Sequence, residues 1–107
     1  MSAINNSKKK YNVAIVGASG AVGEELLLVL DSMDFPIANL VPLASSRSVG
    51  KSVEFKGKSY PILETTEAIF KEKNVEIAFF SAGGSVSAKY APSAVGAGAL
   101  EIGRAHV

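Results

Sequence analysis

Short apolar runs alternate with amphipathic segments along the first half of the chain. The run Asn12–Val16 is almost entirely apolar, is rich in β-branched residues and ends at a glycine, which is typical of a strand buried on both faces of a parallel sheet. From Ala21 to about Met33, apolar residues recur every three or four positions, which predicts an amphipathic helix. Phe35-Pro36 then ends this helix, because a residue that precedes proline avoids the helical conformation.

The middle of the chain predicts a second strand and a hairpin. Asn39–Ala44 has the composition of a strand, although Pro42 cannot donate a hydrogen bond to a neighbour, which argues against a central position. Around Lys56-Gly57-Lys58 the pattern predicts a small antiparallel hairpin, since glycine accepts a positive φ in the turn. Thr65 or Thr66 is expected to cap a short helix through Lys73.

A third strand and a third helix complete the pattern. Val75–Phe80 is another apolar run, and the glycine-rich segment Ser81–Ser85 leads from it into a helix over about Val86–Val95. Strands that alternate with helices predict one α/β domain of the Rossmann type, a largely parallel sheet with helices on both faces. Ligands of such sheets bind outside the carboxyl ends of the strands, where both glycine-rich loops fall.

The first of these loops, Gly17–Gly23, has the spacing GxxGxxG and connects the first strand to the first helix. The first glycine allows a tight turn, the middle one lets the backbone approach a phosphate, and the last permits close packing of helix on strand. The amides and dipole of the helix start favour a diphosphate. A dinucleotide site is therefore expected, the alternative being a turn that only connects the two elements. The candidate binding residues are Gly17, Ser19, Gly20, Ala21, Val22 and Gly23.

The segment after the second strand bears on the choice between NAD and NADP. An NAD site usually carries Asp or Glu about 20 residues past the last glycine, to bind the adenosine ribose. No acid occurs between Asp34 and Glu54, whereas the Arg47 guanidinium can bind a phosphate with two hydrogen bonds and Ser45 and Ser48 offer hydroxyl donors. This pattern favours NADP. The alternative is a loop arginine that faces solvent.

The segment after the third strand contributes further candidates. Ser81, Gly83 and Gly84 are expected beside the ribose or nicotinamide, because glycine lets the backbone pass close to a ligand. Lys89 and Tyr90 follow on the helix, but adjacent helical residues point about 100° apart and no serine partner is identifiable, so proton transfer by this pair is not expected. His106 is the only histidine, and a frayed terminus is expected there.

Composition narrows the possible functions. With 107 residues, 48% of them apolar, the chain suits one globular domain. A formal net charge of +1 without a basic stripe argues against nucleic acid or an anionic membrane as the main partner. The absence of cysteine excludes disulfides, thiolate metal sites and cysteine nucleophiles from this chain.

No apolar run could span a bilayer and no secretory signal is evident, so a cytoplasmic location is expected, with residues 1–10 as a disordered tail.

Four separated segments resemble the amino-terminal, NADP-binding part of the aspartate-β-semialdehyde dehydrogenase family, in the family's order and spacing over residues 11–99. In that family, the positions that match Ser19, Gly20, Ala21 and Val22 form the phosphate turn, and those that match Arg47 and Ser48 bind the adenosine end with its 2′-phosphate. The segments that carry the resemblance are Val16–Gly23, Asp34–Pro36, Ala44–Lys51 and Phe80–Ser87.

The resemblance implies an oxidoreductase that interconverts aspartate semialdehyde, phosphate and NADP⁺ with 4-aspartyl phosphate, NADPH and a proton, in lysine, threonine and methionine biosynthesis. The family's chemistry needs a cysteine thiolate, a histidine and substrate-binding arginines, none of which can be placed here. We therefore expect an inactive fragment, with a sheet incomplete at its carboxyl end and a parent that forms homo-oligomers through the missing domain. The alternatives are N-acetyl-γ-glutamyl-phosphate reductase and a non-catalytic dinucleotide-binding paralogue.

The resemblance stops near Leu100. The family pattern continues there as an apolar strand, whereas this chain continues as Leu-Glu-Ile-Gly-Arg-Ala-His-Val. The last six of these residues correspond to one reading frame of a sequence similar to a common sequencing-library adapter. Residues 100–107 are therefore expected to be a foreign tail, with a divergent natural terminus as the alternative.

Overall fold

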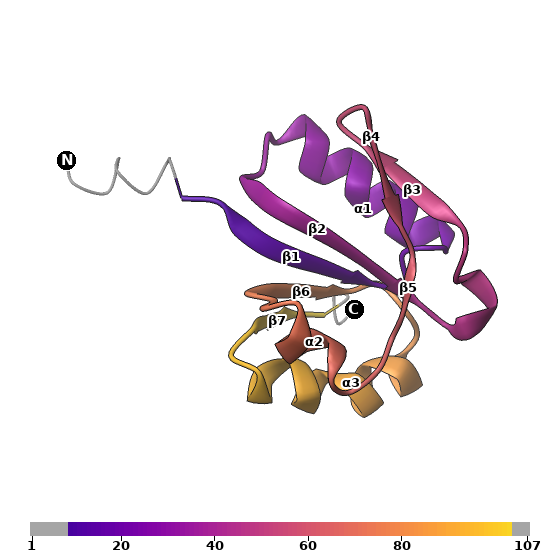
Figure 1. Cartoon of the computed structure of the whole chain (residues 1–107), viewed down its shortest axis with the longest axis vertical. Helices are drawn as coiled ribbons and strands as arrows, with labels where there is room; N and C mark the ends of the chain where they lie inside the picture. Colours follow the sequence, from indigo (N-terminus) through magenta and orange to yellow (C-terminus); the bar gives the residue numbers. More distant parts are fainter. Residues whose placement is uncertain (1–8, 104–107) are drawn as a thin grey trace.

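A parallel sheet of five strands forms the centre of the molecule (Figure 1). The computed structural model describes residues 9–103. Every strand pair in this sheet is parallel, and the spatial order is β5-β2-β1-β6-β7. The five strands are β1 (Tyr11–Val16), β2 (Ile37–Ala44), β5 (Leu63–Glu64), β6 (Ile77–Phe80) and β7 (Leu100–Ile102).

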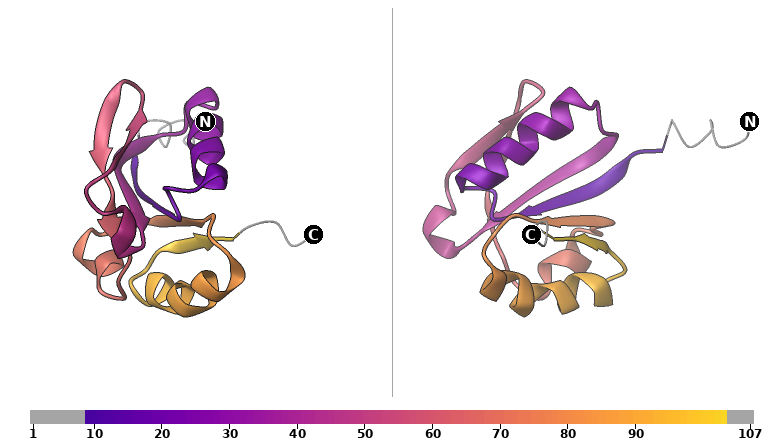
Figure 2. Two further views of the ribbon diagram at one scale, coloured as in Figure 1. Left: turned by 90° about the vertical axis from the view of Figure 1, so that its right-hand side faces the viewer. Right: turned by 180° about the vertical axis from the view of Figure 1, so that it is seen from behind.

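The remaining elements cover the two faces of the sheet. Figure 2 shows helix α1 and a separate two-stranded hairpin on one side, and helices α2 and α3 on the other. These elements are α1 (Ala21–Ser32), the 3₁₀ helix η2 (Ser46–Ser48), the hairpin strands β3 (Ser52–Phe55) and β4 (Lys58–Pro61), α2 (Ile69–Glu72) and α3 (Gly84–Gly96). The α/β class, the parallel sheet and the helices on both faces are confirmed.

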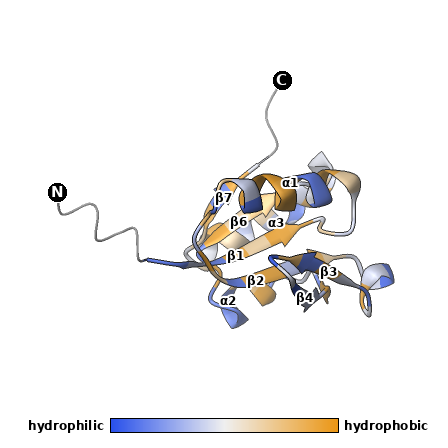
Figure 3. Ribbon diagram, turned by 90° about the horizontal axis from the view of Figure 1, so that it is seen from above, coloured by the Kyte–Doolittle hydropathy of each residue, from blue (hydrophilic) through white to orange (hydrophobic). Residues whose placement is uncertain are grey.

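Alternation along β1 divides the core into two layers. Val13 and Ile15 pack with residues of α1 and the hairpin, while Ala14 and Val16 pack with residues of α2 and α3. All four side chains are fully or almost fully buried, because a parallel strand with helices on both faces has no side open to water. In Figure 3, most of β1 has the colour of hydrophobic residues.

The main predicted elements are confirmed, with ends that shift by one or two residues. α1 ends at Ser32 and α3 begins at Gly84. The hairpin turns through Lys56 and Gly57, which both have positive φ, 52° and 78°. Two positive φ values in a two-residue loop are the geometry that matches the twist of an antiparallel pair.

A threonine does bond to the first amide of this helix, but the cap residue is Ala68 and the helix is shorter than predicted. The Thr66 hydroxyl accepts a hydrogen bond of 3.1 Å from the amide of Ile69. The helix that follows, α2, has only four residues and ends before Lys73. An Asn74 backbone with φ of 52° then turns the chain toward β6.

Pro42 lies within the sheet, and the hydrogen bond between strands that its missing amide hydrogen cannot donate has no partner at this place. β2 has neighbours on both sides, yet β5 pairs only with Leu43 and Ala44. The Leu43 carbonyl points to β1 and the Ala44 carbonyl to β5. Alternation therefore turns Pro42 toward the β5 side, beyond the end of that two-residue strand.

Residues 100–102 form an edge strand. The amide of Leu100 donates a 2.8 Å hydrogen bond to the Glu76 carbonyl, and β7 pairs in parallel with β6. The residues of the expected tail from 104 onward, His106 included, lie outside the described part of the chain, as does most of the expected amino-terminal tail. Among the described helices, none is long and apolar enough to cross a bilayer.

Close contact between α1 and β1 depends on Gly23. A β-carbon at this position would lie 2.5 Å from the Gly17 carbonyl oxygen and 2.9 Å from the Ala18 α-carbon. Both are main-chain atoms, which cannot move aside without displacing the helix. The role assigned to the last glycine of the turn, close packing of helix on strand, therefore agrees with the structure.

We expect Gly23→Ala to lower the free energy of unfolding by about 2 kcal/mol, within the range typical of overpacking, despite the better helix propensity of alanine. Gly96→Ala is the matched control, because no atom lies within 4 Å of a β-carbon there. It should leave stability unchanged or raise it by up to about 1 kcal/mol. Urea unfolding followed by circular dichroism measures both; equal stabilities of the two variants would contradict this account.

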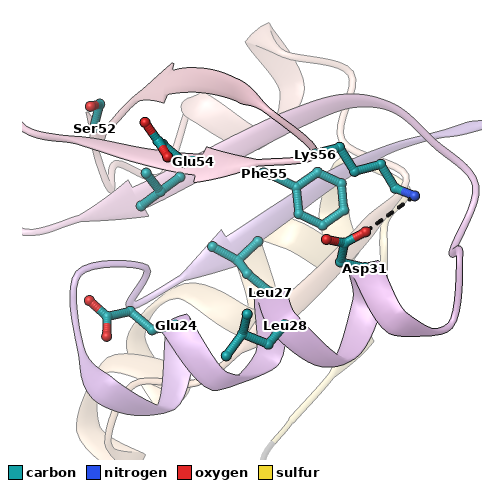
Figure 4. A pocket seen from close by; sticks show the side chains of 9 residues that line it. Glu24, Leu27, Leu28, Asp31, Ser52, Glu54, Phe55 and Lys56 are labelled. Carbon is teal, nitrogen blue, oxygen red and sulfur yellow. Dashed lines mark ion pairs between the residues drawn. The ribbon is translucent and has the colours of Figure 1, made fainter.

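An ion-pair cluster ties the hairpin to the end of α1. The Lys56 ammonium lies 2.8 Å from Asp34 and 3.4 Å from Asp31, the second of which is drawn in Figure 4. The hydrogen bond from Lys56 lowers the pKa of Asp34, and the same bond raises the pKa of Lys56. Because the Asp34 side chain is 89% exposed, its contribution to stability is small.

A folded-state pKa below the unfolded value means that Asp34 stabilises the fold above about pH 4 and loses this effect as the pH falls through its folded pKa. Asp34→Asn should therefore lower stability slightly at pH 7 and make no difference near pH 2. Glu67→Gln, which changes an exposed carboxylate before α2, is the control. Urea unfolding at both pH values tests this, and a deficit for Asp34→Asn that persists at pH 2 would refute it.

Candidate functional site

The carboxyl ends of β1, β2 and β6 lie side by side at one edge of the sheet, because these three strands are adjacent and parallel. The three segments singled out in the sequence follow these ends directly: Gly17–Gly23, Ser45–Ser48 and Ser81–Gly84. The chain runs from β1 to β2 on one side and later places β6 on the other side of β1. This reversal of strand order is where open α/β sheets bind ligands.

Hydrogen bonds fix the turn after β1 to both neighbouring strands. The amides of Gly17 and Ala18 donate to the Leu43 carbonyl at 2.8 and 3.0 Å. On the other side, the Ser81 amide donates to the Val16 carbonyl at 2.9 Å. The buried Ser81 hydroxyl lies 2.9 Å from that same oxygen and 3.2 Å from the Gly17 carbonyl. The hydroxyl proton of Ser81, a candidate for cofactor binding, thus serves to hold the turn.

Gly17 is required by the fold itself. Its φ is +94°, and a β-carbon there would lie 2.9 Å from the Ala82 amide nitrogen and 3.0 Å from the Ser81 hydroxyl oxygen. Both the backbone conformation and the lack of space exclude other residues without rearrangement. The turn therefore passes directly against the start of the segment that follows β6.

Three other glycines of the site leave space that the chain does not fill. A β-carbon at Gly20 would come no nearer than 3.7 Å to another atom, and one at Gly83 or Gly84 would meet nothing within 4 Å. None of the three has a positive φ. The packing of the described chain therefore does not require glycine at these positions, whereas a ligand lying against the backbone would. In this respect the residues present fit a dinucleotide.

Two helix starts lie at this edge. α1 begins after Gly20 and α3 after Gly83, and neither cap residue provides a side-chain hydrogen bond. The first amides of a helix have no partner within it and carry the positive end of its dipole. Since β1 and β6 are neighbours, both positive ends are near the same place, which suits a negatively charged group.

A cleft of about 490 Å³ opens between the turn, the end of β2 and α3. Gly17, Ser19 and Ser45 are the predicted site residues in its lining. Val22 and Ser81 instead line a separate hollow toward β7, and Arg47 is exposed on η2, two residues beyond Ser45. Lys89 is the one charged residue of the lining, which consists of Val16, Gly17, Ser19, Ala44, Ser45, Thr65, Ala82, Ser85, Val86, Lys89 and Tyr90.

Several lining residues were missed by the sequence analysis. Thr65 was considered only as a helix cap, yet its amide and hydroxyl both bond to the Ala44 carbonyl, at 2.8 and 3.2 Å. This pair holds β5 at the end of β2. Lys89 and Tyr90 were weighed only for proton transfer. The signal that could have found them is their spacing of four residues from Ser85 and Val86, which places both pairs on one face of α3.

A second cleft, of about 290 Å³, lies between α1 and the hairpin (Figure 4). Its lining contains three carboxylates, Glu24, Asp31 and Glu54, and one cation, Lys56, which is already paired. This charge repels phosphates, so the cleft at the sheet edge is the better dinucleotide site. Within residues 9–103, no group of three or more His, Cys, Asp or Glu side chains could hold a metal ion.

Curated relatives of this chain include aspartate-semialdehyde dehydrogenases of several bacteria. The chain is 64% identical over 94 residues to the aspartate-semialdehyde dehydrogenase of Campylobacter jejuni, a match that covers 88% of this chain and 27% of that protein. It is 59% identical over 86 residues to the enzyme of that name from Helicobacter pylori, covering 80% of this chain and 25% of that protein. The chain thus spans about a quarter of the length of these curated relatives.

A solved structure similar to this chain is also an aspartate semialdehyde dehydrogenase. The crystal structure of aspartate semialdehyde dehydrogenase II from Vibrio cholerae, complexed with ASA, superposes with a TM-score of 0.83 at 47% identity, covering 90% of this chain and 31% of that one. The family model described as semialdehyde dehydrogenase, NAD binding domain, matches residues 12–105. The chain therefore belongs to the family of semialdehyde dehydrogenase NAD-binding domains.

Proposed function

We propose that this chain is the NADP-binding part of an aspartate-semialdehyde dehydrogenase. One observation carries the proposal: the glycine turn, the Arg47 loop and the segment after β6 converge at the carboxyl edge of the sheet, around a cleft whose lining has one cation and no acid. The identity of 64% to a relative of that name supports this enzyme over N-acetyl-γ-glutamyl-phosphate reductase.

Each part of the edge has a role in this proposal. The turn Gly17–Gly23 and the first amides of α1 bind the diphosphate, for which Gly20 leaves the backbone accessible. Ser45, Arg47 and Ser48 bind the adenosine end. Gly83 and Gly84 let the ribose or nicotinamide lie against the start of α3, where no β-carbon intervenes. Ser81 holds the turn in place through its bonds to β1.

The preference for NADP rests on charge at the end of β2. An acid at this place would bind the ribose hydroxyls of NAD and repel a 2′-phosphate. The chain instead places Ser45, Arg47 and Ser48 there, with Arg47 exposed and its planar guanidinium suited to a phosphate. Arg47 forms no ion pair with any residue in the described part of the chain, so its charge is available to a ligand.

We expect Arg47→Ala to weaken NADPH binding about tenfold, the loss of one charge-assisted hydrogen bond of about 1.5 kcal/mol. Binding of NADH should hardly change, because it lacks the 2′-phosphate. Fluorescence titration of both cofactors measures this, with Lys73→Ala, an exposed cation remote from the cleft, as the control. Equal losses for the two cofactors would mean that Arg47 supports the shape of the loop and does not bind the phosphate.

The complete enzyme, in our proposal, interconverts aspartate semialdehyde, phosphate and NADP⁺ with 4-aspartyl phosphate, NADPH and a proton. A cysteine thiolate attacks the substrate carbonyl and a histidine transfers protons. We assign these residues, the small-molecule substrate site and the contacts of a homo-oligomer to the three-quarters of the relatives' length that lies outside the match.

The 107-residue chain should bind NADPH and yet catalyse no turnover, because it contains no cysteine to form the covalent intermediate. The assay mixes purified chain with aspartate semialdehyde, phosphate and NADP⁺ and follows NADPH absorbance. NADPH titration of the same sample is the control that the dinucleotide site is intact. Turnover that co-elutes with the chain through a second purification step would refute the assignment of catalysis to the missing part.

A further inference from the structure

Lys89 is a cation without a counter-ion in the lining of the cleft. It is the one charged residue there. Among the described residues, the ion pairs involve Lys9 and Lys56, so none includes Lys89. Its ammonium lies 5.3 Å from the centre of the Tyr90 ring, an interaction that leaves its three N–H donors available. The cleft thus presents an ammonium beside several hydroxyls, a combination that suits an anionic ligand.

The position of Lys89 on α3 indicates which anion it can contact. It lies six residues past the Gly83 cap, which is about 9 Å along the helix axis at 1.5 Å per residue. The diphosphate belongs at the helix starts, where free amides already provide donors. The Lys89 backbone therefore lies well past the helix starts, and its side chain lines a cleft whose other wall is the end of β2.

Ser45 and Thr65 line the same cleft from the side of β2 and β5. In dinucleotide-binding sheets, the end of the second strand recognises the adenosine ribose. The adenosine half of NADP carries one phosphate besides the diphosphate, and it is attached to that ribose. This argument rests on the proposed function, because it takes the ligand to be a dinucleotide.

We propose that Lys89 binds the 2′-phosphate of NADP from the α3 side of the cleft and is a second determinant of cofactor specificity, alongside Arg47 on η2. The two cations belong to elements that follow different strands, β6 and β2. Lysine acts here as a point charge, which binds a phosphate without the fixed geometry that a guanidinium demands.

The test uses two pairs of ligands, and the members of each pair differ only in the 2′-phosphate. Adenosine 2′,5′-bisphosphate, AMP, NADPH and NADH are titrated calorimetrically into the wild-type chain, Lys89→Met and Lys89→Arg. Lys71→Met, an exposed lysine of α2 outside the cleft lining, is the matched control, and circular dichroism checks that each variant is folded.

Lys89→Met should weaken the bisphosphate and NADPH about fivefold to tenfold, between the values of an exposed ion pair and a charge-assisted hydrogen bond. AMP and NADH should change by less than about twofold, since an uncharged side chain of similar length still covers the adenosine. Lys89→Arg should retain most of the affinity, and Lys71→Met all of it. The deficit of Lys89→Met should shrink as salt is raised.

The outcomes separate this inference from the proposed function. If the wild type binds NADPH but Lys89→Met leaves all four affinities unchanged, or weakens AMP as much as the bisphosphate, the role of Lys89 in reading the 2′-phosphate is refuted and the dinucleotide site stands. If the folded wild type binds neither NADPH nor NADH, both proposals fail.

Discussion

The approach of α1 to the end of β1 is the contact on which the rest of the site depends. Gly23 faces the Gly17 carbonyl with no room for a β-carbon, and Gly17 in turn lies against the segment after β6. The helix start is thereby fixed over the carboxyl end of β1, and the turn is bonded to β2 through the Leu43 carbonyl and to β6 through Ser81. The amides that would bind a diphosphate are held in position by the fold alone, so little conformational freedom is lost when a ligand binds.

Periodicity was sufficient to predict the elements with large buried faces. β1 and β6 are flanked by neighbours and covered on both sides, so their sequences are almost entirely apolar. On α1 and at its carboxyl cap, Leu27 and Leu30 are buried, whereas Val22, Val29 and Met33 stay exposed. The exposed residues, seven and four positions apart, share one stripe of the helix, and the buried pair lies on another. The spacing does not show which of the two stripes packs on the sheet. β5 could not be predicted, because two residues have no period. Its place follows from the bonds of Thr65 to the Ala44 carbonyl, which join positions 21 residues apart.

The candidate site likewise has one part that the sequence alone could identify and another part that it could not. Glycine spacing after a strand identified the turn, since its physical requirement is local: one positive φ and one close approach within seven residues. The walls of the cleft depend on strand order, which brings Ser45, Thr65 and the face of α3 together. Before that order is known, Lys89 and Tyr90 are two polar residues on a helix. The bond of the Ser81 hydroxyl to main-chain oxygens, which makes it a support for the turn, likewise requires the pairing of β1 with β6.

The electrostatics of the molecule explains why a net charge of +1 is compatible with an anionic ligand. Carboxylates gather in the cleft between α1 and the hairpin, where Lys56 already has two partners. At the carboxyl edge of the sheet, the starts of α1 and α3 add positive potential that a count of charged residues does not include. Two side-chain cations of the site add to it: Lys89 in the lining of the cleft and Arg47 on η2. In our proposal, diphosphate binding thus rests on the backbone, and these two side chains distinguish one dinucleotide from another.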